Sequence, residues 1–231
     1  MSHEFAVEAY LSSKQLNNQS VSLVIPRLTR DKIHNSMYYK VNLTDNSLRG
    51  NTVLQLSKVI VRDLGTLLNG SSQQLNVIGG VEFKCILMKL VEMRPTWEQL
   101  LSLLNIDNDF NSVGTVGEFD NKYITALVLT YIRIQYHFIN SDHQLFNKCK
   151  KLFKLYMNDY RKLKSIAFGT NCWSMSQAID VGIGHIDELV EWLATKNDIW
   201  GLPLAMCSWC NLDEASESES ESTADSDSES N

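Results

Sequence analysis

The stretch EFDNKYITALVLTYIRIQYHFI, residues 118–139, decides the fold class. It is apolar on nearly all sides of a helical wheel, which is typical of the central helix of a bundle. Its most apolar part, 123–139, still contains Arg133, Gln135 and His137. That part is too short and too polar to span a bilayer comfortably. We therefore predict a buried helix here and no membrane association.

Outward from this helix, other segments repeat apolar residues at helical spacing. Pro26 suits the first turn of a helix in which Ile33, Met37 and Val41 form one apolar stripe. Pro95 should end a helix, and Thr96 is a plausible N-cap for the next one. The predicted helices cover residues 27–41, 47–68, 81–94, 96–105, 143–166 and 185–196, with a last short turn or helix at 197–206.

The inward faces follow from the same periodicity. The inward residues are Leu56, Val59, Ile60 and Leu64 in the second helix, Phe83, Ile86, Leu87, Leu90 and Val91 in the third, and Ile186, Leu189, Val190 and Leu193 in the last. In the third helix, Glu82, Lys89 and Glu92 should face outward. Residues 168–184 read as irregular, with room for one short hairpin.

These patterns predict an all-α fold: a single multi-helix globular domain with little or no sheet. The domain covers residues 21–212, after an N-terminal arm at 1–20. Residues 213–231, DEASESESESTADSDSESN, cannot form a core and should be a disordered acidic tail.

The charge of the chain is unevenly divided. The net charge of −6 includes 27 acidic residues, of which eight lie in the tail. The body, residues 1–212, therefore holds 19 acidic and 21 basic residues, a net of +2. Non-specific nucleic-acid binding needs a concentrated basic field, so the near-neutral body argues against it as the main activity.

The segment RLTRDKIHNSMYYK, residues 27–40, is rich in basic and aromatic side chains. On a helical wheel its basic residues do not share one face, as a groove-reading helix would require. Three interpretations stay open: a solvated helix face with local ion pairs, a protein-docking face, or direct contact with RNA. The candidate partner-binding residues here are Arg27, Arg30, Asp31, His34 and Tyr38; Tyr160, Arg161, Lys162 and Lys164 complete the set.

The segment KCKKLFKLYMNDYRKLK, residues 148–164, is the best candidate for contact with RNA. It places seven basic residues on one predicted helix, with aromatic residues between them. Three interpretations stay open: packing of its apolar side with solvated lysines, contact with RNA or phosphates, and contact with an acidic partner segment. The possible RNA contacts are Lys148, Lys150, Lys151 and Lys154.

No catalytic or cofactor site emerges from the motifs. Cys207 and Cys210 have the spacing of half a zinc site or a redox pair, but no second cysteine pair exists and the nearest histidine is His185. Two reduced cysteines are the simpler interpretation. His185 precedes two acidic residues, which fits a helix start better than an active site. We expect no enzyme activity, no metal and no cofactor.

The serines of the tail suit an acid-directed kinase, because each is followed by or lies near an acidic residue. Each phosphate would add about −1.5 to −2 charges. The tail is either a passive solvated terminus or a phosphorylated segment that competes for basic surfaces. The candidate positions are Ser216, Ser218, Ser220, Ser222 and Ser226.

Five segments, in this order and at this spacing, resemble the pre-mRNA-splicing factor 38 family. They are VIPRLTRDKIHNSMYYK at 24–40, IGGVEFKCILMKLVEMRP at 78–95, KYITALVLTYIRIQ at 122–135, LYMNDYRKLKS at 155–165 and HIDELVEWL at 185–193. The resemblance runs from about residue 17 to 205. It is specific as a set, although no single segment is a chemical motif.

The resemblance implies a non-catalytic helical scaffold of the spliceosomal tri-snRNP in the nucleus, required for spliceosome activation. It implies as partners a zinc-finger splicing protein and a largely disordered helical splicing factor, with this chain as a monomer within the larger complex. An RNA-binding module acting through 148–164 is the alternative. Larger members of the family end in an Arg/Ser-rich extension, whereas this chain ends in serine with glutamate and aspartate, so no role of such an extension carries over.

Overall fold

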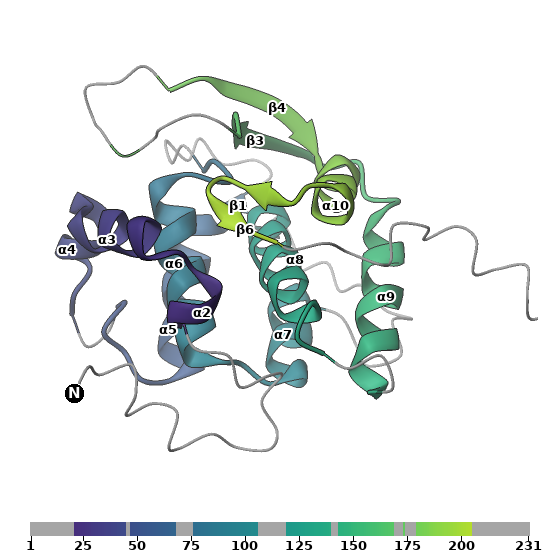
Figure 1. Cartoon of the computed structure of the whole chain (residues 1–231), viewed down its shortest axis with the longest axis horizontal. Helices are drawn as coiled ribbons and strands as arrows, with labels where there is room; N and C mark the ends of the chain where they lie inside the picture. Colours follow the sequence, from purple (N-terminus) through teal and green to yellow (C-terminus); the bar gives the residue numbers. More distant parts are fainter. Residues whose placement is uncertain are drawn as a thin grey trace, which may run out of the picture.

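Helix α8 (Lys122–Tyr136) runs through the middle of the helical body (Figure 1). In this computed structural model, which describes residues 21–44, 47–67, 76–105, 119–139, 143–168, 173 and 179–204, every residue from Tyr123 to Tyr136 is buried. Helices α5, α6, α7, α9 and α10 all pack against it. The predicted central helix is therefore confirmed. No described helix is long and apolar enough to cross a membrane.

The helices around α8 bury the faces that the periodicity predicts. They are α5 (Val53–Leu64), α6 (Val81–Met93), α7 (Trp97–Leu104), α9 (Gln144–Tyr156) and α10 (Ile186–Thr195). All the inward-facing residues predicted for α5, α6 and α10 are buried. Lys89, predicted to face outward, is also buried, and its ammonium group lies 3.1 Å from the carboxylate of Glu92.

The start of α7 is built as predicted. Arg94 takes a left-handed conformation at the end of α6, before Pro95. The Thr96 hydroxyl accepts a hydrogen bond from the Gln99 amide, and the Gln99 side chain accepts one from the Thr96 amide. This reciprocal capping box satisfies two amides that an α-helix leaves unpaired at its start.

The helix predicted for 27–41 is broken at Ser36. It becomes α3 (Arg27–Asn35) and α4 (Met37–Val41), after the short α2 (Val21–Val24). The Ser36 hydroxyl donates to the Ile33 carbonyl at 2.7 Å and accepts from the Tyr39 amide, so it ends one helix and caps the next. The predicted apolar stripe is therefore wrong: Ile33 is buried, but Met37 and Val41 are about two-thirds exposed.

The helix predicted for 143–166 ends ten residues early, at Tyr156. Residues Lys162–Ile166 instead form strand β3, which pairs antiparallel with β4 (Val181–His185). A short hairpin was expected within 168–184, but only β4 lies partly in that range, and its partner strand comes from the supposed helix. Alternating burial in β3, with Leu163 and Ser165 inside, explains the misassignment, since its lysines also fit a helical wheel.

Two further strand pairs were not predicted. Strand β1 (Thr66–Leu67), at the end of the supposed second helix, pairs with β2 (Phe119–Asp120). Strands β5 (Asp198–Ile199) and β6 (Leu202–Pro203) replace the predicted last turn or helix. A tight turn with positive φ at Trp200 and Gly201 joins them. The mostly helical fold is confirmed, and the expectation of little or no sheet is an underestimate.

The β5–β6 hairpin packs against the rest of the body at Gly79. Gly79 has a φ of 77°, and a Cβ there would lie 2.5 Å from the Trp200 indole. The Trp200 indole N–H donates to the Ile166 carbonyl at 3.1 Å. Absence of a side chain at Gly79 thus lets three distant segments meet: the turn before α6, the end of β3, and the β5–β6 hairpin.

Candidate partner-binding surfaces

Helix α3 presents part of the predicted partner surface to solvent. The side chains of Arg27 and Asp31 are 87% and 60% exposed and form an i,i+4 ion pair at 3.8 Å. His34 is also exposed, with its ring 5.0 Å from that of Tyr39. Arg30 lies closer to the body, where its Nε donates to the Ile25 carbonyl at 3.1 Å. The charges on this face are therefore accessible, but partly paired within the chain.

Tyr38, by contrast, points into the body and joins α4 to α5. Its hydroxyl donates a hydrogen bond to the Asp63 carboxylate. Arg62 donates to the same carboxylate from its Nε and Nη2, at 2.6 and 2.7 Å. Arg62 Nη2 reaches Asn42 as well, at 2.9 Å. Burial, followed by the hydrogen bond and charge of Asp63, raises the pKa of Tyr38. The Tyr38 hydroxyl is thus already engaged.

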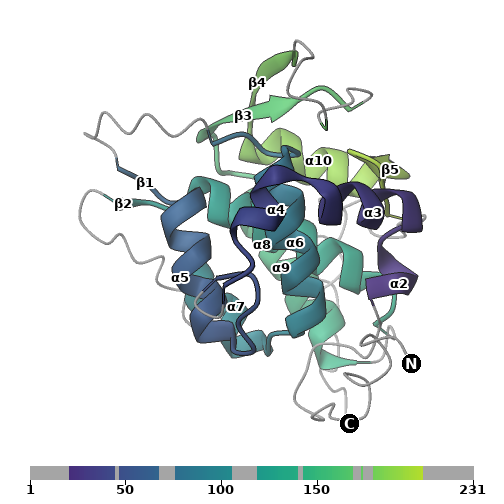
Figure 2. The same cartoon turned by 90° about the vertical axis from the view of Figure 1, so that its left-hand side faces the viewer.

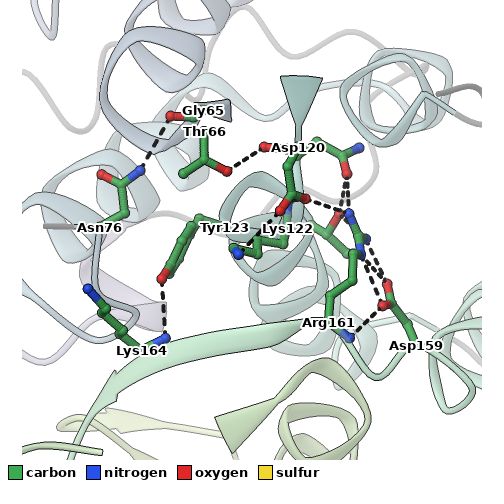
Figure 3. Close-up of polar contacts among 11 residues, drawn as sticks. Gly65, Thr66, Asn76, Asp120, Lys122, Tyr123, Asp159, Arg161 and Lys164 are labelled. Carbon is green, nitrogen blue, oxygen red and sulfur yellow. Dashed lines mark hydrogen bonds and ion pairs between the residues drawn. The ribbon is translucent and has the colours of Figure 1, made fainter. Parts of the chain in front are cut away.

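Arg161 is the centre of a polar network (Figure 3). Its guanidinium donates to Asp159 at 2.6–3.0 Å, to Asp120 at 3.0 Å and to Asn121 at 2.8 Å. Lys122 completes the network by pairing with Asp120 at 3.2 Å. Burial disfavours the charge on Arg161, but the carboxylates of Asp159 and Asp120 outweigh it and raise the pKa of the guanidinium. The network ties the start of β3 to the start of α8.

The remaining residues of this second group point outward. Tyr160 is 68% exposed, and the side chains of Lys162 and Lys164 are exposed on one face of β3. The backbone of Lys164 is used internally: its amide donates to the Tyr123 hydroxyl at 3.2 Å (Figure 3), and its carbonyl accepts from the Ile78 amide at 2.8 Å. Arg161 therefore positions this segment, whereas its three neighbours are free to meet a partner.

The two predicted groups lie on elements that contact the β5–β6 hairpin at different residues. Thr29 of α3 donates to the Gly201 carbonyl at 3.2 Å. The Trp200 indole donates to the carbonyl of Ile166 at the end of β3. Figures 1 and 2 show α3 and β3 as separate parts of the surface. The sequence-predicted residues thus form two surfaces rather than one.

The lysines predicted to contact RNA all lie on α9. Lys151 and Lys154 are exposed, whereas Lys148 and Lys150 are half-buried. The Lys150 ammonium group lies 5.0 Å from the centre of the Phe146 ring. Because α9 ends at Tyr156, these lysines and those of β3 do not form one continuous basic helix.

Sequence reasoning missed the exposed apolar side chains. Among the described residues, the large apolar side chains that are exposed fall mainly into two groups. The first spans α3 to β1 and contains Leu28, Met37, Val41, Leu43, Leu54, Val61 and Leu67; the second lies on and beside β4 and contains Ile179, Val181 and Ile183. Leu28 could have been found from the sequence, because it lies out of phase with Ile33 and among charged residues.

The other chemical candidates have structural environments where they are described. His185 caps α10 in a reciprocal arrangement with Glu188, which confirms the predicted helix start. Cys85 and Cys149 are buried thiols, and burial raises the pKa of Cys149 to about 12. Cys207, Cys210 and the five tail serines lie outside the described residues, as do the arm at 1–20 and the tail at 213–231.

Comparisons with known proteins agree with the five-segment resemblance. The model of the PRP38 family matches residues 14–216. Pre-mRNA-splicing factor 38 of Saccharomyces cerevisiae is 51% identical over 224 residues, which cover 93% of this chain and 89% of that protein.

A solved structure shares the fold. A chain in the crystal structure of the Snu23–Prp38–MFAP1(217–258) complex of Chaetomium thermophilum matches with a TM-score of 0.54 and 17% identity. The match covers 88% of this chain and 87% of that chain. At this identity the likeness concerns the fold alone. Because the family model and the yeast relative both span most of the sequence, this chain belongs to the PRP38 family.

Proposed function

We propose that this chain is a non-catalytic protein-interaction scaffold of the spliceosomal tri-snRNP, acting in the nucleus during spliceosome activation. The yeast relative, 51% identical, is named as a pre-mRNA-splicing factor, which supports a role in splicing. The solved chain with the same fold is part of a complex with Snu23 and MFAP1. The partners proposed here are counterparts of those two proteins: a zinc-finger splicing protein and a largely disordered helical splicing factor.

The observation that carries the proposal is the exposed, mixed face of α3. Leu28, at 68% exposure, lies beside Arg27 and Asp31 on the same helix. An apolar anchor ringed by charges of both signs is typical of a protein-binding surface. Arg30 and His34 border this face, whereas Tyr38 lies on the next helix and joins α4 to α5 through Asp63.

The second proposed surface lies around Tyr160, Lys162 and Lys164. The network of Arg161 fixes the backbone of this segment while leaving the three side chains exposed. A rigid backbone with exposed aromatic and basic side chains suits an acidic or aromatic partner segment, because little conformational entropy is lost on binding. Arg161 itself acts here as a positioning residue.

The test is recovery of the tagged protein from nuclear extract, before and after nuclease treatment. We expect splicing proteins to stay bound after the RNA is destroyed. The variant Arg27→Glu/Leu28→Asp should lose a subset of them. Its new acidic residues lie in the first turn of α3, where the helix dipole favours them, so the fold should be kept.

The matched control is Lys151→Glu/Lys154→Glu, which removes exposed charge from α9 and leaves α3 untouched. This variant should recover the same proteins as the wild type. If all splicing proteins leave with the RNA, and the α9 variant alone impairs recovery, the RNA-binding module is the correct function. Recovery of no splicing protein at all would refute both.

A further inference from the structure

Strand β4 forms an open edge of the β3 sheet. On its other side β3 meets Ile78, whose amide donates to the Lys164 carbonyl at 2.8 Å and whose carbonyl accepts from the Ile166 amide at 3.1 Å. The order across the sheet is therefore Ile78, β3, β4. In Figure 1, β4 lies at the outer boundary of the molecule, on the side of β3 away from the helices.

The direction of the backbone groups of β4 follows from its neighbours. The even-numbered residues Lys164 and Ile166 of β3 point their groups toward Ile78. The odd-numbered residues of β3 must then bond β4, and the register pairs Leu163 with Gly184 and Ser165 with Gly182. Hence the amide and carbonyl groups of Val181 and Ile183 point away from β3, to the open edge.

No partner within the chain covers this edge in the part that the structure describes. No hydrogen bond is formed there by the amides or carbonyls of Val181 and Ile183, while the next outward amide, that of His185, is capped by Glu188. The side chain of Ile183 is 74% exposed, and Val181 is 42% exposed. Natural proteins usually protect such an edge with charge, proline or a bulge, and β4 carries none of these.

The surroundings of the edge define what could pair with it. Lys164 lies directly opposite Ile183 in the register, so its ammonium group shares the face on which Ile183 projects. Lys162 projects from the same face, two residues earlier. On the opposite face, a Cβ at Gly182 would meet no atom within 4 Å. One face of an added strand would thus meet lysines and isoleucine. The other face would find open space beside Gly182, and Glu188 and Trp192 beside Gly184.

We propose that β4 accepts an extended segment of a partner protein as an additional strand, one that carries apolar and acidic side chains together on the face that it shares with Ile183. Unpaired backbone groups select an extended chain, Val181 and Ile183 select apolar side chains, and the two lysines select carboxylates. The site is distinct from the α3 face. It shares Lys162 and Lys164 with the second proposed surface, and it rests on the proposed function in that the partner is a protein.

The test uses the purified full chain and a fluorescent nine-residue peptide in which valine and glutamate take turns at every second position, with serine at the positions between them. Binding is followed by fluorescence anisotropy. Ile183→Ala keeps the outward amide and should weaken binding about fivefold through lost apolar contact. Ile183→Pro also removes that amide and should weaken binding about tenfold further. Because the amide does not bond β3, proline fits the strand without breaking the hairpin.

Two controls separate backbone recognition from charge. Lys162→Glu/Lys164→Glu should abolish binding of the acidic peptide and favour the same peptide with lysine in place of glutamate. If Ile183→Pro lowers the melting temperature, two N-methylated peptides are used in place of this variant. One is methylated at the odd-numbered residues and the other at the even-numbered residues. One of the two should lose binding, and the other should keep it.

Three outcomes overturn the proposal. The first is equal binding by the alanine and proline variants, or by both methylated peptides. The second is no binding by the wild-type chain at millimolar peptide. The third is a dimer of the wild-type chain in analytical ultracentrifugation that Ile183→Pro abolishes. That result would show that a second copy of this chain pairs with the edge of β4. None of these outcomes depends on whether the chain is recovered with splicing proteins.

Discussion

Arg161 is the clearest case of a residue whose role the sequence does not reveal. Its position among lysines suggested an exposed basic side chain, yet it pairs with two carboxylates that are themselves mostly buried: the side chains of Asp120 and Asp159 are 9% and 16% exposed. Removing it would leave these carboxylates without their main partner. Such a loss costs more than the pair contributes, because desolvated charge is left unpaired.

We predict that Arg161→Ala lowers the free energy of unfolding by about 2–4 kcal/mol. Arg161→Lys should recover only part of this, since an ammonium group cannot reach Asp159 and Asp120 with the same planar fork. Urea denaturation measures the change. Arg27→Ala is the matched control: its exposed ion pair with Asp31 should contribute less than about 1 kcal/mol. Equal losses for both alanine variants would contradict the network.

Cys149 offers a second test at the scale of one residue. Burial raises its pKa to about 12, so the reactive thiolate is scarce at pH 8. We expect iodoacetamide to leave Cys149 unmodified in the native protein and to modify it readily in urea. Mass spectrometry of tryptic peptides measures both. Modification in the native state at the denatured rate would show that α9 opens far more often than its packing indicates.

At the scale of the element, the Gly79-Gly80 turn before α6 makes the sharpest prediction. Gly79→Ala combines a positive φ with a Cβ 2.5 Å from the Trp200 indole. Left-handed strain and overpacking together should cost about 2–4 kcal/mol. Gly80→Ala is the matched control, because its nearest contact would be 3.2 Å from the Val77 carbonyl and its φ is not positive. Thermal melts of the two variants measure the difference, and similar losses would refute the packing of Trp200 on Gly79.

Elements with a long buried face could be predicted from the sequence. Helices α8 and α10 repeat apolar residues through several turns, and the capping residues of α7 are local in sequence. Periodicity and capping rules could therefore predict where these helices begin and end.

The strands could not be predicted, for a physical reason that differs from one to the next. Strand β3 is defined by pairing with β4, fifteen or more residues away, and its lysines are compatible with either period. The β1–β2 and β5–β6 pairs are two residues long, too short for any pattern. The break at Ser36 depends on one hydroxyl that bonds two helices at once.

The candidate surfaces were predictable by composition but not by geometry. The sequence correctly placed exposed charge at Arg27 and Asp31, and exposed side chains at Tyr160, Lys162 and Lys164. It could not show that Tyr38 and Arg161 point into polar networks, because their partners Asp63 and Asp120 lie 25 and 41 residues away in the chain. Nor could it show the open edge of β4.

At the scale of the whole molecule, the near-neutral body and the two separated surfaces favour a scaffold that holds protein segments on different sides. The PRP38 family membership and the exposed apolar residues support the same interpretation. A rigid, mostly buried core is what such a scaffold requires, and its rigidity has a consequence that can be measured in the free chain.

The core holds several acidic hydroxyl and thiol groups in their neutral forms. Burial is the largest cause that raises the pKa of Tyr38, Tyr131, Cys149 and Tyr156, the last two to about 12. Their unfolded values are close to 9.0 for the cysteine and 10.0 for the tyrosines. Above these values the unfolded chain releases protons that the folded chain retains. The stability contributed by these groups is therefore complete below pH 9 and is lost as the pH rises.

We predict that the urea midpoint is level between pH 7 and 8.5 and falls progressively above about pH 9.5. Each group titrating only in the unfolded chain should remove up to about 1.4 kcal/mol of unfolding free energy per pH unit. Tyr131→Phe removes one such group without emptying the core, so its midpoint should fall less steeply than that of the wild type. A midpoint that stays level to pH 11, or a Tyr131→Phe slope equal to the wild-type slope, would mean that water reaches these hydroxyls in the folded chain, and that the body is looser than a rigid scaffold.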